Sequence, residues 1–535
     1  MKPSDTVLVP YMSTQAGRRF RPFLLVGLLI YSALTGVGIA ILPPDLLFIL
    51  AVPILIAFGA ILWMLPDGRR PVPVNSIASL FVAFIVANCF WPNYLALDLP
   101  GLPWINPPRI IAFSLLTIGL YHYATSRELR EEVAATLRAL PLFKNAFWLF
   151  WAITLVTVGL SAQPLFSLNK WVNNQIFWTF LFVASAWICT KPGVLARLGT
   201  ALVWTAILIS LEAIYEYHIQ QVPWMDHIPS WLKVDSEYMA RVMQTQGRAG
   251  TDVYRARGTF SVSLILAEYL AIVYPFMIHA MLNARAVWQK YALFMALVAT
   301  VTAMWLTNAR SGMIGFFMSV FLYGTFAAVR HWRRRRHSLV GITSLAMLPI
   351  AATIFVFLAI TWPRLHNMTI GGGQHQPSTE AREAQWASGW PKVFRNPIGH
   401  GVARAGETLG YANGAGVLTI DTYYLSLLLE YGFAGFALFL FMFGGQVMPG
   451  LRMFMQSADG DEESLTGPTT IALLNFLVIK SVLSSEFNIP IAFIFLGFLF
   501  AVARRRQMRE LVPVVGSSPS SPALAGPQGR LAIAR

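Results

Sequence analysis

The chain is built from long apolar runs, of which residues 260–282 are representative. They read FSVSLILAEYLAIVYPFMIHAML, with Glu268 as the one acidic residue. A helix of about 20 apolar residues crosses the ~30 Å hydrocarbon core of a bilayer. Lipid offers no hydrogen-bond partner to backbone N–H and C=O groups, so a chain that crosses it must satisfy them internally as a helix. This run therefore predicts a transmembrane helix.

Similar runs recur on both sides of residues 260–282 and predict an all-α, polytopic transmembrane bundle of about 12–14 spans. No small-residue cleavage site follows the first run, so we expect a retained anchor rather than a signal peptide. The predicted spans are 23–41, 46–65, 74–90, 109–124, 146–163, 176–190, 198–216, 260–282, 290–307, 313–330, 338–362, 424–446, 469–487 and 489–503.

Composition excludes a soluble enzyme. Of 535 residues, 56% are hydrophobic and 12% are charged, about half the charged fraction of a soluble domain. The net charge of +15 does not indicate nucleic-acid binding, because the basic residues cluster in short loops beside apolar runs. Cys89 and Cys189 lie within apolar runs, which favours small buried side chains over a disulfide framework.

The basic residues also predict orientation, because cytoplasmic loops retain Lys and Arg. Alternate loops carry these basic residues, which places residues 1–22 and 504–535 in the cytoplasm. The Pro- and Ser-rich tail from residue 511 onward is expected to be disordered. The spans then form three groups, 23–216, 260–362 and 424–503. The residues that set this pattern include Arg18, Arg19, Arg69, Arg70, Arg127, Arg130, Lys191, Arg197, Arg285, Lys290, Arg333, Arg334, Arg452, Arg504, Arg505 and Arg506.

Two long loops, 217–259 and 363–423, fall on the predicted extracytoplasmic side. Loops held by a rigid helical scaffold are where binding and catalytic residues concentrate. We therefore expect function on that face of the protein.

The first of these loops ends with Arg248, Arg255 and Arg257, directly before a predicted helix. Positive charge is disfavoured there, so its concentration indicates an anionic partner. Guanidinium groups suit phosphate because they donate two parallel hydrogen bonds and stay protonated, and a helix N-terminus adds its dipole. The alternative is pairing with nearby acids or lipid headgroups; the acids are Asp235, Glu237 and Asp252.

Arg310 stands alone in the short outward turn between the predicted spans 290–307 and 313–330. An unpaired Arg beside hydrocarbon costs several kcal/mol, so it requires a ligand or a counter-charge. The structural alternative is an ion pair with an intramembrane acid, either Glu268 or Glu430.

The second loop holds the run Asn396-Pro-Ile-Gly-His-Gly401, with His400 between glycines, and ends at Asp421 before a helix. Asp421 is a candidate base or an N-cap, and His400 is a candidate titrating group or a flexible loop residue. With Arg248 and Arg255, the candidate substrate-binding residues are His400, Arg404, Tyr424 and Glu430. The chain has no nucleotide-binding glycine loop, no metal-ligand pair at helical spacing and no suitably ordered Ser-His-Asp set. We expect no cofactor and no metal.

Taken together, these segments resemble the bacterial O-antigen ligase and polymerase superfamily over roughly residues 198–445. The resemblance rests on four landmarks: Arg257-Gly-Thr-Phe260, Ala309-Arg-Ser-Gly312, Asn396–Gly401, and Asp421-Thr-Tyr-Tyr-Leu425 with Leu429-Glu-Tyr-Gly432. Members transfer glycans from undecaprenyl diphosphate at the outer face of the bacterial inner membrane.

The resemblance implies that Arg257 and Arg310, helped by Arg255, hold the diphosphate without a metal, and that Asp421 acts as general base. Ligases of the family commonly carry His-Asn where this chain has Asp421-Thr422, which favours a polymerase making capsule, exopolysaccharide or O-antigen. The implied partners are the lipid-linked donor, a glycan or lipid A core acceptor, membrane lipids and other polysaccharide-assembly proteins.

Two alternatives remain open. A ligase would use lipid A core as its acceptor. A transporter or flippase of lipid-linked glycans would instead carry charges along a midplane path and paired internal repeats. The arginines gather at one face and no convincing repeat is present, which favours catalysis over translocation.

Overall fold

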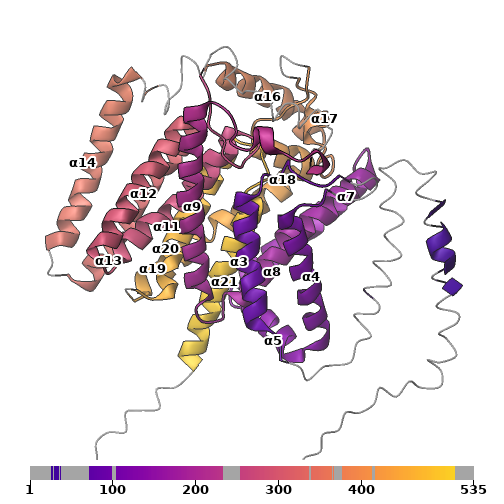
Figure 1. The fold of residues 1–535 in the computed structure, drawn as a ribbon, viewed down its shortest axis with the longest axis horizontal. Helices are drawn as coiled ribbons and strands as arrows, with labels where there is room; N and C mark the ends of the chain where they lie inside the picture. Colours follow the sequence, from indigo (N-terminus) through magenta and orange to yellow (C-terminus); the bar gives the residue numbers. More distant parts are fainter. Residues whose placement is uncertain are drawn as a thin grey trace, which may run out of the picture.

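The computed structural model describes residues 71–98, 104–232, 253–336, 339–363, 376–412, 416–458 and 460–511, with residue 366 and short pieces among residues 26–59. Within these ranges the secondary structure is helical, apart from the isolated bridges Leu97–Ile105 and Ala412–Leu418. The prediction of an all-α bundle is confirmed (Figure 1). Part of the predicted span 23–41 and nearly all of the predicted span 46–65 lie outside the described residues.

Six of the described helical stretches are long and apolar enough to cross a membrane, and the chain is a multi-pass membrane protein. They are α6 (Pro141–Gly159), α9 (Val194–Ile219), α11 (Ser263–Asn283), α12 (Val287–Leu306), α13 (Arg310–Arg334) and Tyr423–Gln456, which joins α18 (Tyr423–Gly444) to α19 (Val447–Gln456).

Five more helices coincide with predicted spans. Four of them are shorter, less apolar or more charged: α3 (Val74–Phe90), α4 (Pro107–Thr125), α20 (Thr466–Lys480) and α21 (Ile489–Leu511). The fifth, α14 (Leu339–Thr361), is apolar along its length and carries no charged residue. The predicted span 176–190 is a composite in which α7 (Pro164–Asn174) continues through a π-helical turn, Gln175–Phe180, into α8 (Leu181–Ile188).

Helices also form in segments for which the sequence predicts loops. Besides α7 and α19, they include α5 (Arg127–Leu137), α16 (Gln376–Arg395) and α17 (Ala405–Leu409). The last two belong to the long loop 363–423, and Figure 1 shows them together at one end of the bundle. We refer to this as the α16 end.

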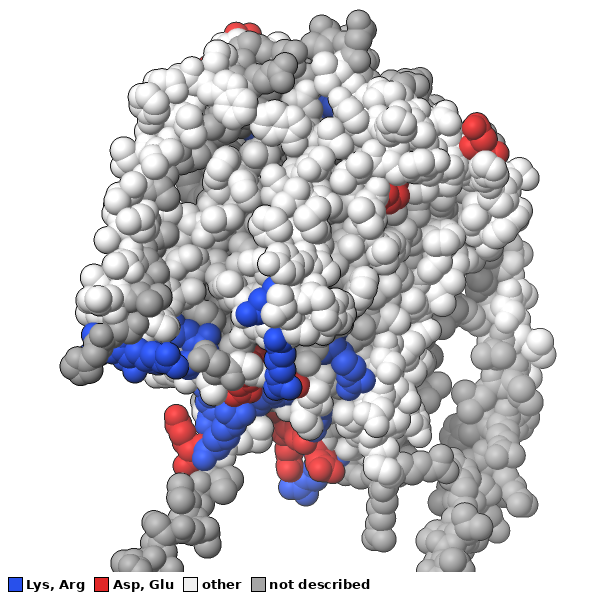
Figure 2. All heavy atoms as spheres, turned by 60° about the vertical axis from the view of Figure 1, so that its left-hand side comes forward, with Lys and Arg blue, Asp and Glu red and all other residues white. Residues whose placement is uncertain are grey.

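Charged side chains gather at the opposite end. Figure 2 shows Lys, Arg, Asp and Glu concentrated along the lower part of the visible face, below a wide uncharged surface. There Arg505 pairs with Glu462 at 2.9 Å and Arg506 with Glu463 at 3.1 Å, while Arg330 donates to the Ser457 carbonyl at 2.8 Å. We call this the basic end. Its ion pairs tie α21 to the Glu462–Leu465 turn, and its Arg330 bond ties α13 to the end of α19.

Small residues bring α11 and α13 into close contact. A Cβ built on Gly315 would lie 2.3 Å from the Ala271 Cβ, and one on Gly312 would lie 3.2 Å from the Ala267 Cβ. Membrane helices associate through such small residues because apolar burial alone gains little in lipid. This contact fixes where α13 begins, and therefore where Arg310 lies.

A fully buried ion pair crosses the interior between α11 and α20. The Lys480 Nζ lies 2.8 Å from Glu268 Oε1, and both side chains are 0% exposed. Asn488 donates to the other oxygen of Glu268 at 2.9 Å, and Lys480 also donates to the Ser485 carbonyl. The loop between α20 and α21 is thereby held against α11.

We expect Lys480→Met to destabilise the protein by about 3–5 kcal/mol, because it leaves the Glu268 carboxylate buried and unpaired. The measurement is the thermal unfolding midpoint of the full chain purified in detergent. Adding Glu268→Gln to the same chain should recover much of the loss.

The matched control for this prediction is Arg127→Gln, which removes one partner of the exposed Arg127–Glu131 pair. Exposed pairs contribute little to stability, so its midpoint should stay near that of the natural chain. Equal midpoints for Lys480→Met and Arg127→Gln would contradict the role assigned to the buried pair.

Candidate active site

A cavity of about 580 Å³ lies at the α16 end, between the start of α13, one face of α16, the residues before α18 and the loop between α20 and α21. Three guanidinium groups and two carboxylates face it. The residues that carry its chemistry are Arg255, Arg310, Thr379, Arg382, Glu383 and Asp421.

Backbone contacts bring Arg255 beside the turn that precedes α13. The Ala256 N–H donates to the Leu306 carbonyl at 3.1 Å, and the Arg255 Nε donates to the Thr307 carbonyl at 3.0 Å. The turn itself is tight, with Asn308 in the left-handed region at φ 49°, a conformation that Asn adopts more readily than most residues. Arg255 and Arg310 therefore line the same cavity, although some fifty residues separate them.

Arg310 is the first residue of α13, and its Nη2 donates to the Thr379 hydroxyl at 3.1 Å. Glu268 and Glu430 are the two acids considered as a counter-charge for Arg310, and neither forms an ion pair with it in the described part of the chain. Glu268 pairs with Lys480, and Glu430 accepts from the Ala405 N–H at 3.4 Å. Arg310 thus presents its charge to the cavity.

A face of α16 supplies the residues that sequence reasoning missed. Thr379, Arg382, Glu383 and Trp386 follow helical spacing, and all four line the cavity. The Arg382 Nε is buried and has no hydrogen-bond partner among the described residues. Burial lowers the pKa of Arg382, and the Asp421 carboxylate opposes that shift. The helical spacing of these four residues, within a segment predicted to be a loop, is the feature of the sequence that could have indicated them.

Asp421 is held at the cavity by its backbone. Its N–H donates at 2.8 Å to Oε1 of Gln385, a fully buried residue of α16. The N-cap of α18 is Thr422, and no side chain caps the helix by a hydrogen bond. The Asp421 carboxylate is therefore not used as a cap and faces the cavity.

Arg257 lies in the interior, 4% exposed, and is not among the residues that line the cavity. Its own N–H and that of Gly258 donate to Glu216 Oε2 at 3.0 and 2.6 Å, and Tyr254 donates to Glu216 Oε1 at 2.6 Å. Burial raises the pKa of Tyr254, and the neighbouring Glu216 carboxylate raises it further. Arg248 lies outside the described residues.

The Asn396–Gly401 run docks on a break in α18. Gly432 has φ 65° and ψ −169°, a conformation that is essentially restricted to glycine. The His400 N–H donates to the Leu429 carbonyl at 2.8 Å and the Phe433 N–H donates to the Pro397 carbonyl at 3.1 Å. Two of the sequence landmarks are thus one structural unit, and His400 belongs to it rather than to the cavity lining.

The other candidate binding residues also lie outside the cavity lining. Arg404 donates to Gln163 at 2.9 Å and pairs with Glu407. The Tyr424 hydroxyl donates to the Leu477 carbonyl. Glu430, 7% exposed, faces the start of α17. These contacts tie the start of α17 to the start of α7, and α18 to α20.

The fold and the cavity together define a multi-pass helical membrane protein with an arginine-lined cavity at one end of its bundle. Residues 268–440 match the family described as O-antigen ligase, so the chain carries an O-antigen ligase family domain. The match runs from α11 into α18 and includes Arg310, Arg382 and Asp421, while Arg255 precedes it. No curated protein matches the chain.

We expect Gly432→Ala to destabilise the protein by about 3 kcal/mol or more, because the new Cβ would meet the Pro397 carbonyl oxygen at 2.0 Å in a conformation closed to alanine. The measurement is the thermal midpoint in detergent. Gly406→Ala is the control, since it lies in α17 with no atom within 4 Å of the added methyl. Matching midpoints for the two variants would contradict the docking role of Gly432.

Proposed function

We propose that the protein transfers a glycan from a polyprenyl diphosphate, undecaprenyl diphosphate in bacteria, to a sugar hydroxyl, and that the cavity at the α16 end is its active site. The observation that carries the proposal is the convergence of Arg255, Arg310 and Arg382 with Asp421 on one cavity. The O-antigen ligase family domain over residues 268–440 supports the same reaction class.

The arginines supply the electrostatics that this reaction needs. A diphosphate leaving group develops negative charge as its bond to the sugar breaks, and guanidinium groups held in place stabilise that charge. Arg310 also stands at the N-terminus of α13, where the free N–H groups and the helix dipole favour anions. Arg310 and Arg382 are assigned to the diphosphate, with Arg255 beside them.

Asp421 is assigned as the general base. It takes the proton from the acceptor hydroxyl while that oxygen forms a bond to the anomeric carbon of the donor. The bond between that carbon and the diphosphate oxygen breaks, and its electron pair leaves with the lipid diphosphate. This step requires only that the Asp421 carboxylate lies within hydrogen-bond reach of the acceptor hydroxyl.

The charge pattern supports an orientation with the basic end in the cytoplasm and the α16 end outside. The proposed site then faces the compartment in which glycans are assembled on lipid carriers. In this arrangement the protein resides in the bacterial inner membrane with both termini cytoplasmic.

A polymerase is favoured over a ligase by Asp421-Thr422, which stand where ligases commonly carry His-Asn. A ligase acting on lipid A core is the second candidate, because the matched family is described as O-antigen ligase. The two differ in acceptor and share the proposed chemistry at the donor.

We expect Arg310→Ala and Arg382→Ala each to lower the transfer rate by about 100-fold or more, because each removes a cation aligned with the leaving group. The measurement is the consumption of lipid-linked repeat units by membranes containing the variant. Arg395→Ala, an exposed change on the same helix as Arg382 that does not line the cavity, is the control and should keep normal turnover. Full activity in both cavity variants would refute the assignment.

We expect Asp421→Asn to lower the rate by roughly 10²–10⁴-fold, because an amide cannot accept the hydroxyl proton. Glycan chain length in cells separates the two candidates. Single repeats accumulating on lipid indicate a polymerase, whereas long chains that stay on their lipid carrier indicate a ligase. Normal glycans from this variant would be inconsistent with a base at Asp421.

A further inference from the structure

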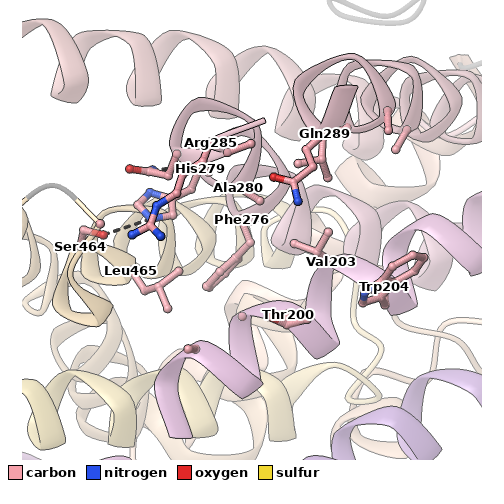
Figure 3. A pocket seen from close by; sticks show the side chains of 18 of the residues that line it. Thr200, Val203, Trp204, Phe276, His279, Ala280, Arg285, Gln289, Ser464 and Leu465 are labelled. Carbon is pink, nitrogen blue, oxygen red and sulfur yellow. Dashed lines mark hydrogen bonds between the residues drawn. The ribbon is translucent and has the colours of Figure 1, made fainter. Parts of the chain in front are cut away.

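A second cavity, of about 710 Å³, lies toward the basic end and takes no part in the proposed reaction (Figure 3). Its walls are α9, the last two turns of α11, the first half of α12 and residues 460–465. It is larger than the cavity at the α16 end, and the glycan chemistry gives it no role.

The cavity is an elongated groove along α9. Six α9 residues at helical spacing line it, from Ala196 to Ile207, a stretch of roughly 16 Å at 1.5 Å per residue. Thr200 on α9 and Ala292 and Ala296 on α12 are small residues of its lining, whereas Gly199 packs against the Leu465 side chain. A groove of this length accommodates much of an extended acyl chain.

One side of the groove faces the surroundings of the bundle. Trp204 is 58% exposed and Trp288 is 70% exposed. Only 22% of the apolar window of α12 is buried, so this helix turns most of its surface outward. In a membrane-spanning bundle that surface contacts lipid, which makes acyl chains the natural occupants of the apolar part.

The polar side chains of the groove gather at one end. Figure 3 shows Arg285, His279 and Ser464 together, with Trp204 at the far end. His279 is already engaged, because its Nδ1 lies 2.7 Å from the Tyr323 hydroxyl and its Nε2 lies 3.1 Å from the Ser464 hydroxyl. Arg285 is the cation at this end, and it has no ion-pair partner among the described residues.

The acids at this end are neutralised by other arginines. Glu462 pairs with Arg505 at 2.9 Å, and Asp461 lies 3.5 Å from Arg509. The charge left for a ligand is therefore the positive charge of Arg285. The amide nitrogen of Gln289, which also lines the groove, has no acceptor among the described residues and is a second donor.

We propose that this groove binds an anionic phospholipid of the leaflet at the basic end. Arg285 contacts its phosphate, Gln289 donates to a headgroup oxygen, and an acyl chain lies along α9 between the small residues of α9 and α12. Arg285 lies at one end of the groove and the apolar channel extends from it. This arrangement matches a lipid, in which an anionic headgroup is joined to a hydrocarbon chain. The inference does not depend on the proposed glycan transfer.

The test is native mass spectrometry of the full chain purified in detergent, titrated with dioleoyl phosphatidylglycerol or dioleoyl phosphatidylcholine. We expect tighter binding of phosphatidylglycerol, weakened about tenfold by Arg285→Gln, which removes a charge-assisted hydrogen bond. Arg285→Lys keeps the charge and should retain most of the binding. Ala296→Phe fills the apolar half of the groove and should weaken the binding of both lipids.

Lys290→Gln is the matched control, since Lys290 is an exposed cation near Arg285 that does not line the groove. Its binding should stay within about twofold of the natural chain, as expected for a surface charge with only general attraction to headgroups. Equal losses in Arg285→Gln and Lys290→Gln would overturn the proposal. Equal affinity of the natural chain for the two lipids would overturn it as well.

Discussion

The Glu216 carboxylate organises the region from which the cavity is built. It is fully buried on α9 and accepts three hydrogen bonds from the segment before α11, from Tyr254 and from the backbone at residues 257 and 258. Gly258, with φ 60°, permits that approach. Because the segment is fixed here, its next contact, with the turn before α13, places Arg255 beside Arg310. The alignment of the arginines thus depends on an acid that does not line the cavity.

The sequence predicts the all-α class well, because hydrocarbon leaves a spanning chain so few options. The sequence singles out Arg310 and Asp421 because each is a polar residue at the edge of an apolar run, and both line the cavity. It does not single out Arg382, because α16 is a polar helix within a predicted loop and its packing determines which face lines the cavity. Closeness in sequence does not ensure closeness in space: Arg257 is two residues from Arg255, but it is buried in the interior and does not line the cavity.

The two ends of the bundle use charge differently. At the basic end, Arg505 and Arg506 pair with acids and Arg330 donates to a carbonyl group, and these contacts hold helices together. At the α16 end, Arg310 and Arg382 line a cavity with Asp421 and form no ion pair with a described residue, and desolvation there makes each charge more effective toward a ligand. The docking of residues 396–401 on α18 depends on glycine and backbone hydrogen bonds, and the buried Glu268–Lys480 pair holds the loop that forms another wall of the cavity.

The buried pair between Glu268 and Lys480 also constrains how the protein is made. Each residue alone adds about 2.5–3.5 kcal/mol to the insertion of its helix into lipid, and the partner of Glu268 is synthesised some two hundred residues later. At translation rates of about 5–20 residues per second, α11 waits roughly 10–40 s for its counter-ion. During that interval the nascent chain must be sheltered by the insertion machinery or by neighbouring helices. The bundle is therefore fully assembled only after α20, which carries Lys480, has joined it.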